Sequence, residues 1–145
     1  MEVAAMANAI NEKTETILAQ WQTCVEMANA VSQRRDSMNN LFITLNLAMV
    51  TAVSVTWDKK ALFIVMAGIM FSIIWLYLIR NYKLLNEKKY GVIIALESKL
   101  PEAPFNNEWK KLQADRKYID GTKLEYPIPI TFMVIYIAAA LVIVL

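Results

Sequence analysis

The sequence predicts an all-α membrane protein: three transmembrane helices, a long N-terminal amphipathic helix and a cytoplasmic helical loop. Of its 145 residues, 57% are hydrophobic, compared with about 45–50% in ordinary soluble domains. The apolar residues are gathered in three blocks that contain no charged side chain. Only three glycines and four prolines occur, which argues against a turn-rich β fold. A chain of this length predicts a single membrane domain, residues 1–145.

Each apolar block is close to the length that crosses a bilayer as a helix. The blocks cover residues 41–57, 61–79 and 127–145, and about 20 helical residues cross about 30 Å of hydrocarbon. A small soluble protein has too much surface to bury three such helices. We therefore predict three spans, the first two joined as an antiparallel hairpin. Four aromatic residues lie near the block ends, where such rings favour the membrane interface: Trp57, Trp75, Tyr77 and Tyr126.

The distribution of lysine and arginine predicts the orientation of the spans. Of the fifteen basic residues, three lie in residues 1–40, two in the hairpin turn and ten in residues 80–125. The positive-inside rule therefore places the N-terminus and residues 80–125 in the cytoplasm, and the C-terminus outside. The first ten residues lack the features of a cleavable signal peptide. A bacterial inner membrane is the simplest setting.

Residues 1–40 predict a cytoplasmic helix with one apolar stripe. No glycine or proline occurs before residue 68, so this helix can continue into the first span. The stripe either packs on its own chain or on the membrane, or it forms a seam against identical helices in an oligomer. It repeats every seven residues and has three flanking members: Val3, Ile10, Ile17, Cys24 and Val31, with Ala7, Trp21 and Ala28.

Residues 80–125 predict a helical loop that begins by continuing the second span. Pro101 and Pro104 end that helix, Asn106 or Asn107 is expected to cap a short second helix, and residues 120–121 form a turn. The bend is interpreted as a packed structural corner, with a docking surface for a partner protein as the alternative. Five residues define this corner: Leu100, Pro101, Pro104, Phe105 and Trp109.

This segment also carries a pattern that resembles the RipA family of octameric bacterial inner-membrane proteins. The resemblance covers about residues 80–136, and its most specific part is LP-x-x-PF-x-x-EW over residues 100–109. It implies an inner-membrane homo-octamer and no defined chemistry. Other residues of the pattern are Tyr82, Leu85, Asn86, Lys89, Tyr90, Leu96, Glu97, Tyr118, Thr122, Glu125, Tyr126, Pro127, Phe132 and Tyr136.

The first span has a polar stripe that would line a narrow passage if several copies faced an axis, with Leu47 as an apolar constriction. Alternatively, its hydroxyl groups bond their own helix or a neighbouring helix. Asn46 points the other way and is expected to bond between helices, while Gly68 and Ser72 form a small-residue pair that permits close helix approach. The candidate pore-lining residues are Asn40, Thr44, Leu47, Thr51 and Ser54.

Signals for catalysis are absent from the sequence. It has no histidine, no CxxC pair and no glycine-rich phosphate loop, so we expect no catalytic residue, no cofactor and no metal. Glu97, Glu102 and Glu108 are interpreted as solvated surface. Acidic residues interleave with the basic ones, which argues against nucleic acid as a partner. Four basic residues just inside the membrane are expected to meet lipid headgroups: Arg80, Lys83, Lys88 and Lys89.

These observations predict a homo-oligomeric, ring-like membrane protein with a structural or pore-forming role. Its partners would be copies of itself and membrane lipids. A pore would serve envelope homeostasis or act as a membrane effector. The alternative is a membrane-anchored interaction module whose cytoplasmic loop recruits another protein.

Overall fold

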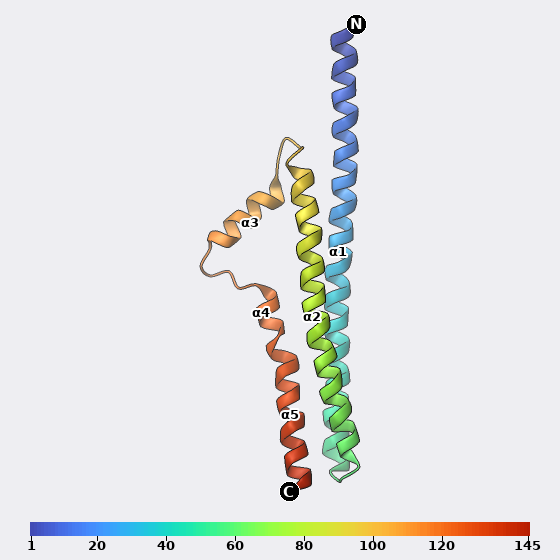
Figure 1. Ribbon diagram of the computed structural model, residues 1–145, viewed down its shortest axis with the longest axis vertical. Helices are drawn as coiled ribbons and strands as arrows, with labels where there is room; N and C mark the ends of the chain where they lie inside the picture. Colours follow the sequence, from blue (N-terminus) through green and yellow to red (C-terminus); the bar gives the residue numbers. More distant parts are fainter. The chain divides into compact units, whose positions relative to one another are not determined.

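The computed structural model describes the backbone of residues 1–145 and all side chains except those of Ala4 and Ala7. The predicted contribution of Ala7 to the apolar stripe therefore lies outside the described residues. The chain forms five helices (Figure 1), and the described backbone contains no strand, which confirms the all-α class. The helices are α1 (Glu2–Thr56), α2 (Ala61–Glu97), α3 (Pro104–Ala114), α4 (Gly121–Glu125) and α5 (Pro127–Val144).

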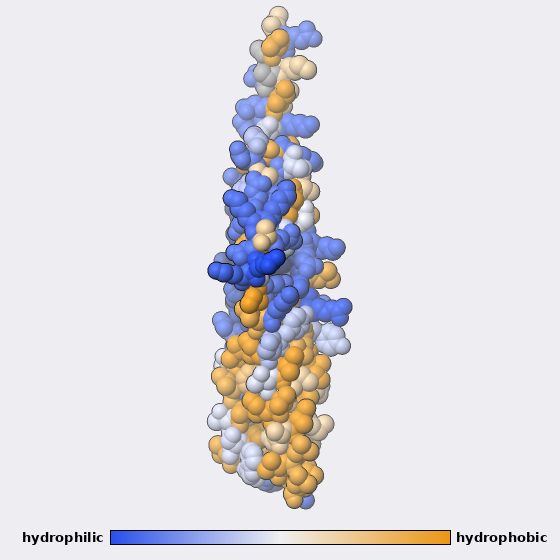
Figure 2. Space-filling model, turned by 90° about the vertical axis from the view of Figure 1, so that its left-hand side faces the viewer, coloured by the Kyte–Doolittle hydropathy of each residue, from blue (hydrophilic) through white to orange (hydrophobic). Residues whose placement is uncertain are grey.

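Three of these helices, α1, α2 and α5, are long and apolar enough to cross a membrane. Helix α1 runs without a break for 55 residues, as expected from a segment that has no glycine or proline. Helix α2 continues past the second apolar block to Glu97. Proline at the start of α5 is well placed, because the first turn of a helix has no N–H partner to lose. Hydrophobic side chains cover the surface around α5 in Figure 2, as a lipid-facing surface requires.

The residues group into two compact units, to which α1 and α2 both contribute. Unit 1 comprises Met1–Ser32 and Leu84–Tyr118. Its apolar stripe on α1 is partly covered: Ala28 and Val31 are buried and Trp21 packs on Phe105, with ring centroids 5.8 Å apart. This stretch packs on its own chain, one of the two predicted alternatives. Val3 and Ile10 are exposed.

Unit 2 comprises Gln33–Lys83 and Ile119–Leu145. Within it α1 and α2 form the predicted antiparallel hairpin, and the C-terminus of α5 lies at the same end as the hairpin turn (Figure 1). One apolar cluster joins the three helices near that turn, and a second contains Phe42, Trp75 and Ile79. Trp75 is only 1% exposed, so its prediction as an interface residue is wrong, whereas Trp57 and Tyr77 are exposed.

The turn between α1 and α2 has an unusual backbone at Trp57. Its N–H still donates to the carbonyl of Val53, but its φ is 27°, in the left-handed region. A helix often ends with such a residue, usually glycine, because a Cβ there costs roughly 1–2 kcal/mol. Asp58 then accepts hydrogen bonds from the N–H groups of Lys60 and Ala61, at 2.8 and 3.3 Å, which closes the turn.

The start of α3 differs from the prediction. The helix begins at Pro104, so the capping position is Ala103 rather than Asn106 or Asn107, and Ala103 makes no side-chain capping bond. Proline is favoured in the first helical turn for its fixed φ. The turn predicted at residues 120–121 is wrong: Gly121 is the first residue of the short helix α4, and Asp120 caps that helix by accepting from the N–H of Thr122 at 2.9 Å.

Candidate functional site

The five candidate pore-lining residues share one exposed face of α1 in unit 2. The hydroxyls of Thr44, Thr51 and Ser54 each donate to the carbonyl four residues earlier, at 2.9 Å. This is the bonding that the alternative interpretation of the stripe expected. The face can therefore meet hydrocarbon, a neighbouring helix or water without leaving a hydroxyl donor unpaired. Leu47, the expected constriction, is 55% exposed on this face.

The opposite face of α1 centres on Asn46, which is completely buried. Its side-chain amide donates to the carbonyl of Phe42 at 2.8 Å. Its Oδ1 accepts from α2, with the Ser72 hydroxyl at 3.2 Å, and from α5, with the Tyr136 hydroxyl at 3.0 Å. The prediction that Asn46 bonds between helices is confirmed. Such bonds fix the rotation of each helix about its axis, because a buried polar group in hydrocarbon must be paired.

Gly68 lies directly beneath the ring of Tyr136. A Cβ built on Gly68 would overlap three atoms of that ring, so this position requires glycine. Four residues later on α2, the Ser72 hydroxyl lies 2.9 Å from the Gly68 carbonyl and is completely buried. The predicted small-residue pair of Gly68 and Ser72 therefore permits the close approach of α5 to α2.

Above this buried contact, aromatic rings join the three helices. Phe42 of α1 stacks on Trp75 of α2, with centroids 5.6 Å apart, and Phe132 of α5 lies 6.4 Å from Trp75. The indole N–H of Trp75 donates to Asn39 Oδ1 at 2.8 Å. The Trp75 ring is therefore packed against other aromatic rings and its N–H group has a hydrogen-bond acceptor, which explains its burial.

Helix α4 is held by two ion pairs. Both Nε and Nη2 of Arg35 donate to Glu125 Oε2, at 3.0 and 2.7 Å, and Nη2 also donates to the Thr122 hydroxyl at 2.8 Å. Lys83 Nζ lies 3.2 Å from Asp120 Oδ2. These contacts tie the segment that precedes α5 to α1 and α2. Sequence reasoning counted Arg35 only as a basic residue, because its partner lies 90 positions away.

The environment of Asp120 favours its ionised form. Burial raises the pKa of this carboxyl group, but the hydrogen bonds from the Thr122 N–H and from Lys83 outweigh it. The net effect is a pKa below the ordinary value of 3.8. Asp120 is therefore a charged cap at neutral pH, where it pairs with Lys83.

The predicted corner in unit 1 is organised by Glu97. This carboxylate is 1% exposed and accepts from the N–H groups of Phe105 and Asn106, at 3.1 and 3.0 Å. The last residue of α2 therefore caps the start of α3, where helix N–H groups favour a negative charge. The prediction of Glu97 as solvated surface is wrong. The available signal was a glutamate that precedes a helix-starting Pro-Phe pair, with Phe105 eight residues after Glu97.

The five corner residues are not equally buried. Phe105 lies between Trp21 and Tyr90, with ring centroids 5.8 and 6.1 Å away. Leu100 is half-buried, whereas Pro101 and Pro104 are exposed. Trp109 is 45% exposed and meets the edge of Tyr118 at 6.5 Å. Phe105 thus packs as the structural interpretation expected, while Trp109 offers an open ring surface.

The four predicted headgroup residues also differ. Arg80 and Lys88 are exposed and Lys89 is half-buried, and contact of these three with lipid headgroups stays a prediction. Lys83 is engaged with Asp120, so its charge is at least partly used within the protein. No group of three potential metal ligands gathers among the described side chains.

The fold and these contacts define a class: a helical membrane protein whose three long apolar helices are joined by buried polar contacts. The chain belongs to the octameric membrane protein family (8xMP), which it matches over residues 18–145. The family's name supports self-association, as the resemblance implied, and the match extends well beyond residues 80–136; the name RipA is not part of it. Neither the curated proteins nor the solved structures contain a match to this chain.

Proposed function

We propose that eight copies of this protein form a ring in which the polar face of α1 lines a narrow axial passage. The main support for this proposal is the difference in burial between two faces of α1. One face buries Phe42, Asn46 and Val53 against α2 and α5, whereas the face with the polar stripe is exposed in the subunit. An octamer offers an axis toward which eight such faces can turn.

The chemistry of the stripe suits a mildly polar passage with an apolar gate. Thr44 and Thr51 lie on either side of Leu47 on the same face. Their hydroxyl oxygens remain available as acceptors for water, although their protons are used within the helix. A ring of Leu47 side chains would exclude water at its narrowest point and so gate by dewetting.

The proposed setting is a bacterial inner membrane with the N-terminus and residues 80–125 in the cytoplasm. Ten of the fifteen basic residues lie in that segment, and the positive-inside rule gives the orientation. The hairpin turn and the C-terminus then lie on the other side. We assign the protein no enzymatic role, because its sequence has no histidine and no catalytic motif.

Single-channel recording with the purified octamer in planar bilayers tests the passage. Leu47→Ser should increase ion flux, since a polar ring removes the dewetting barrier. The matched control is Leu45→Ser, because Leu45 is also exposed on α1 but lies on a different face. If a verified octamer carries no current and neither Leu47→Ser nor Leu45→Ser produces one, a passage lined by this stripe is refuted.

The alternative role is a membrane anchor that recruits a partner protein through residues 80–125. Its supporting observation is the exposed aromatic pair of Trp109 and Tyr118, 45% and 43% exposed. Aromatic side chains are enriched at the centres of protein interfaces. Trp109→Ala should then abolish co-purification of the partner and leave octamer mass and melting unchanged. A change in mass or melting would instead assign Trp109 to packing within the assembly.

A further inference from the structure

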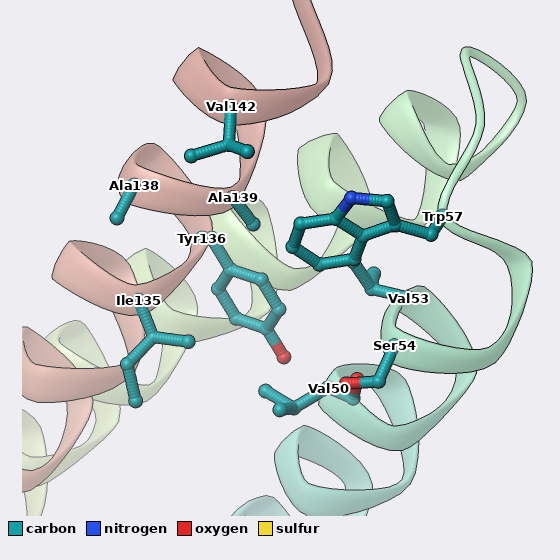
Figure 3. A pocket seen from close by; sticks show the side chains of 9 residues that line it. All are labelled: Val50, Val53, Ser54, Trp57, Ile135, Tyr136, Ala138, Ala139 and Val142. Carbon is teal, nitrogen blue, oxygen red and sulfur yellow. The ribbon is translucent and has the colours of Figure 1, made fainter.

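A pocket lies between α1 and α5 of unit 2, close to the turn that follows α1 (Figure 3). It is lined by residues 50–57 of α1 and its end, and by residues 135–142 of α5. Its volume of about 310 Å³ falls at the lower end of the roughly 300–1,000 Å³ typical of small-molecule sites.

The lining of this pocket is suited to a hydrocarbon chain. It is almost entirely aliphatic and aromatic, with Ala138 and Ala139 leaving space that larger side chains would fill. The two hydroxyls in the lining already donate elsewhere: Ser54 to the Val50 carbonyl, and Tyr136 to Asn46. An occupant therefore gains dispersion contacts here and needs no polar group at this depth.

Trp57 forms one wall of the pocket at the cost of an unfavourable backbone. Its ring faces the pocket from the α1 side, across from Tyr136 and Ala139 on α5 (Figure 3). Its φ of 27° is one that glycine would adopt more readily. Because this left-handed residue ends α1, the turn directs the Trp57 ring toward α5, where it closes one side of the pocket.

Two lysines immediately beyond Trp57 identify the chemistry of the occupant. Lys59 and Lys60 are both exposed. The neighbouring Asp58 carboxylate is bound to the N–H groups of Lys60 and Ala61 at 2.8 and 3.3 Å, within the turn itself. A membrane-spanning chain thus presents an apolar pocket next to two cationic side chains at a span end. That combination matches an acyl chain joined to a phosphate.

We infer that this pocket binds an anionic phospholipid, one acyl chain between α1 and α5 and the headgroup phosphate at Lys59 and Lys60. Bulk lipid is as apolar as the pocket, so burial alone gives little preference within a bilayer. The preference comes from filling a packing void and from the two charges. The rival occupant is a side chain of a neighbouring subunit, which would have no need of the lysine pair.

Tryptophan fluorescence in liposomes containing lipids with brominated acyl chains tests the inference. The contribution of Trp57 to the quenching is the difference between the unaltered protein and Trp57→Phe, and this difference reports on the pocket. Brominated phosphatidylglycerol should quench that contribution more than its mole fraction predicts, while brominated phosphatidylcholine should not. Replacing Lys59 and Lys60 by glutamine should lower the preference for phosphatidylglycerol by about fivefold per lysine.

Ala138→Phe should fill the pocket and abolish the preference over bulk lipid. The matched control is Val134→Phe, since Val134 is exposed on α5 outside the pocket. Quenching that follows mole fraction for both lipids in the unaltered protein would overturn the inference. Protection of Trp57 from both lipids would also overturn it, in favour of a neighbouring subunit. If Ala138→Phe disrupts the octamer, the quenching measured in the unaltered protein and in the lysine variants still tests whether the pocket prefers phosphatidylglycerol.

Discussion

Gly68 of α2 has no room for a side chain because the ring of Tyr136 from α5 lies on its backbone. The same tyrosine places its hydroxyl 3.0 Å from Asn46 Oδ1 of α1, so one side chain connects all three long apolar helices. Its ring sets how closely α5 approaches α2, and its hydroxyl sets the rotation of α5 relative to α1. This contact is the clearest determinant of how the spans of unit 2 pack.

Gly68→Ala should destabilise the protein by about 1–3 kcal/mol, because a methyl group there overpacks against a ring and cannot be accommodated by a flexible chain end. The control is Gly91→Ala, which meets open space in the C-terminal part of α2. That substitution should be neutral or stabilising by about 0.5–1 kcal/mol. Thermal melting of the detergent-solubilised octamer measures both changes. Equal melting temperatures for the two variants would contradict the assigned contact.

Asn46→Leu and Tyr136→Phe should each cost about 1 kcal/mol rather than several. The Tyr136 hydroxyl also lies 3.1 Å from the Asn46 carbonyl, and Ser72 retains the Gly68 carbonyl, so each hydroxyl keeps a second acceptor. A double-mutant cycle on unfolding free energies should give a coupling of about 0.6 kcal/mol. Strictly additive losses would mean that the two side chains do not interact.

Glu97→Gln should loosen the start of α3 by about 1–2 kcal/mol, since the amide offers one acceptor oxygen in place of two. Amide hydrogen exchange at Phe105 and Asn106 should become about tenfold faster for each 1.4 kcal/mol lost. Glu102→Gln provides the control, because Glu102 is exposed. The prediction fails if both variants exchange at the same rate.

Arg35→Lys should destabilise the attachment of α4 by about 1–2 kcal/mol, although the charge is retained. Lysine cannot donate at once to Glu125 and to the Thr122 hydroxyl with the geometry of a guanidinium group. Arg34→Lys is the matched control, since the neighbouring Arg34 is exposed. Protease sensitivity at residues 119–126 should rise only in the first variant, and a rise in both would argue against a specific contact.

Acid should release the cap of α4. Because the pKa of Asp120 is lowered by folding, its stabilising effect is complete above the ordinary value of 3.8 and is lost as the pH falls through the folded value. Amide exchange at Thr122, corrected for intrinsic rates, should therefore keep its protection above the ordinary value of 3.8 and lose it as the pH falls below that value. Asp120→Asn, which keeps an acceptor oxygen, should remove this dependence. Asp36→Asn should leave it intact.

Several features were predictable because they depend on local chemistry. The three helices long and apolar enough to cross a membrane follow from hydropathy, since a bilayer admits only segments that satisfy their own backbone hydrogen bonds. The unbroken α1 follows from the absence of glycine and proline. The inward direction of Asn46 follows from the 100° turn per residue of a helix. Each of these features is decided within a few residues of the chain.

Three wrong or missing predictions depend on partners outside the local helix. Trp75 lies near a block end, but Asn39 and Phe42 cover it, so it is core rather than interface. Glu97 caps a helix that begins after an intervening bend, and Arg35 pairs with Glu125 across 90 residues. The contacts of Trp75 and Arg35 have no fixed spacing that a pattern could reveal, whereas Glu97 lies only eight residues before Phe105.

The sequence by itself determined which segments are helical and which of them enter hydrocarbon, because both depend on solvent preference and local backbone bonding. Only the tertiary structure decided which polar side chains meet, where Tyr136 requires a glycine, and that Trp57 borders a pocket. Those outcomes depend on the rotation and separation of whole helices. Both quantities are set by the sum of many side-chain contacts rather than by any local run of residues.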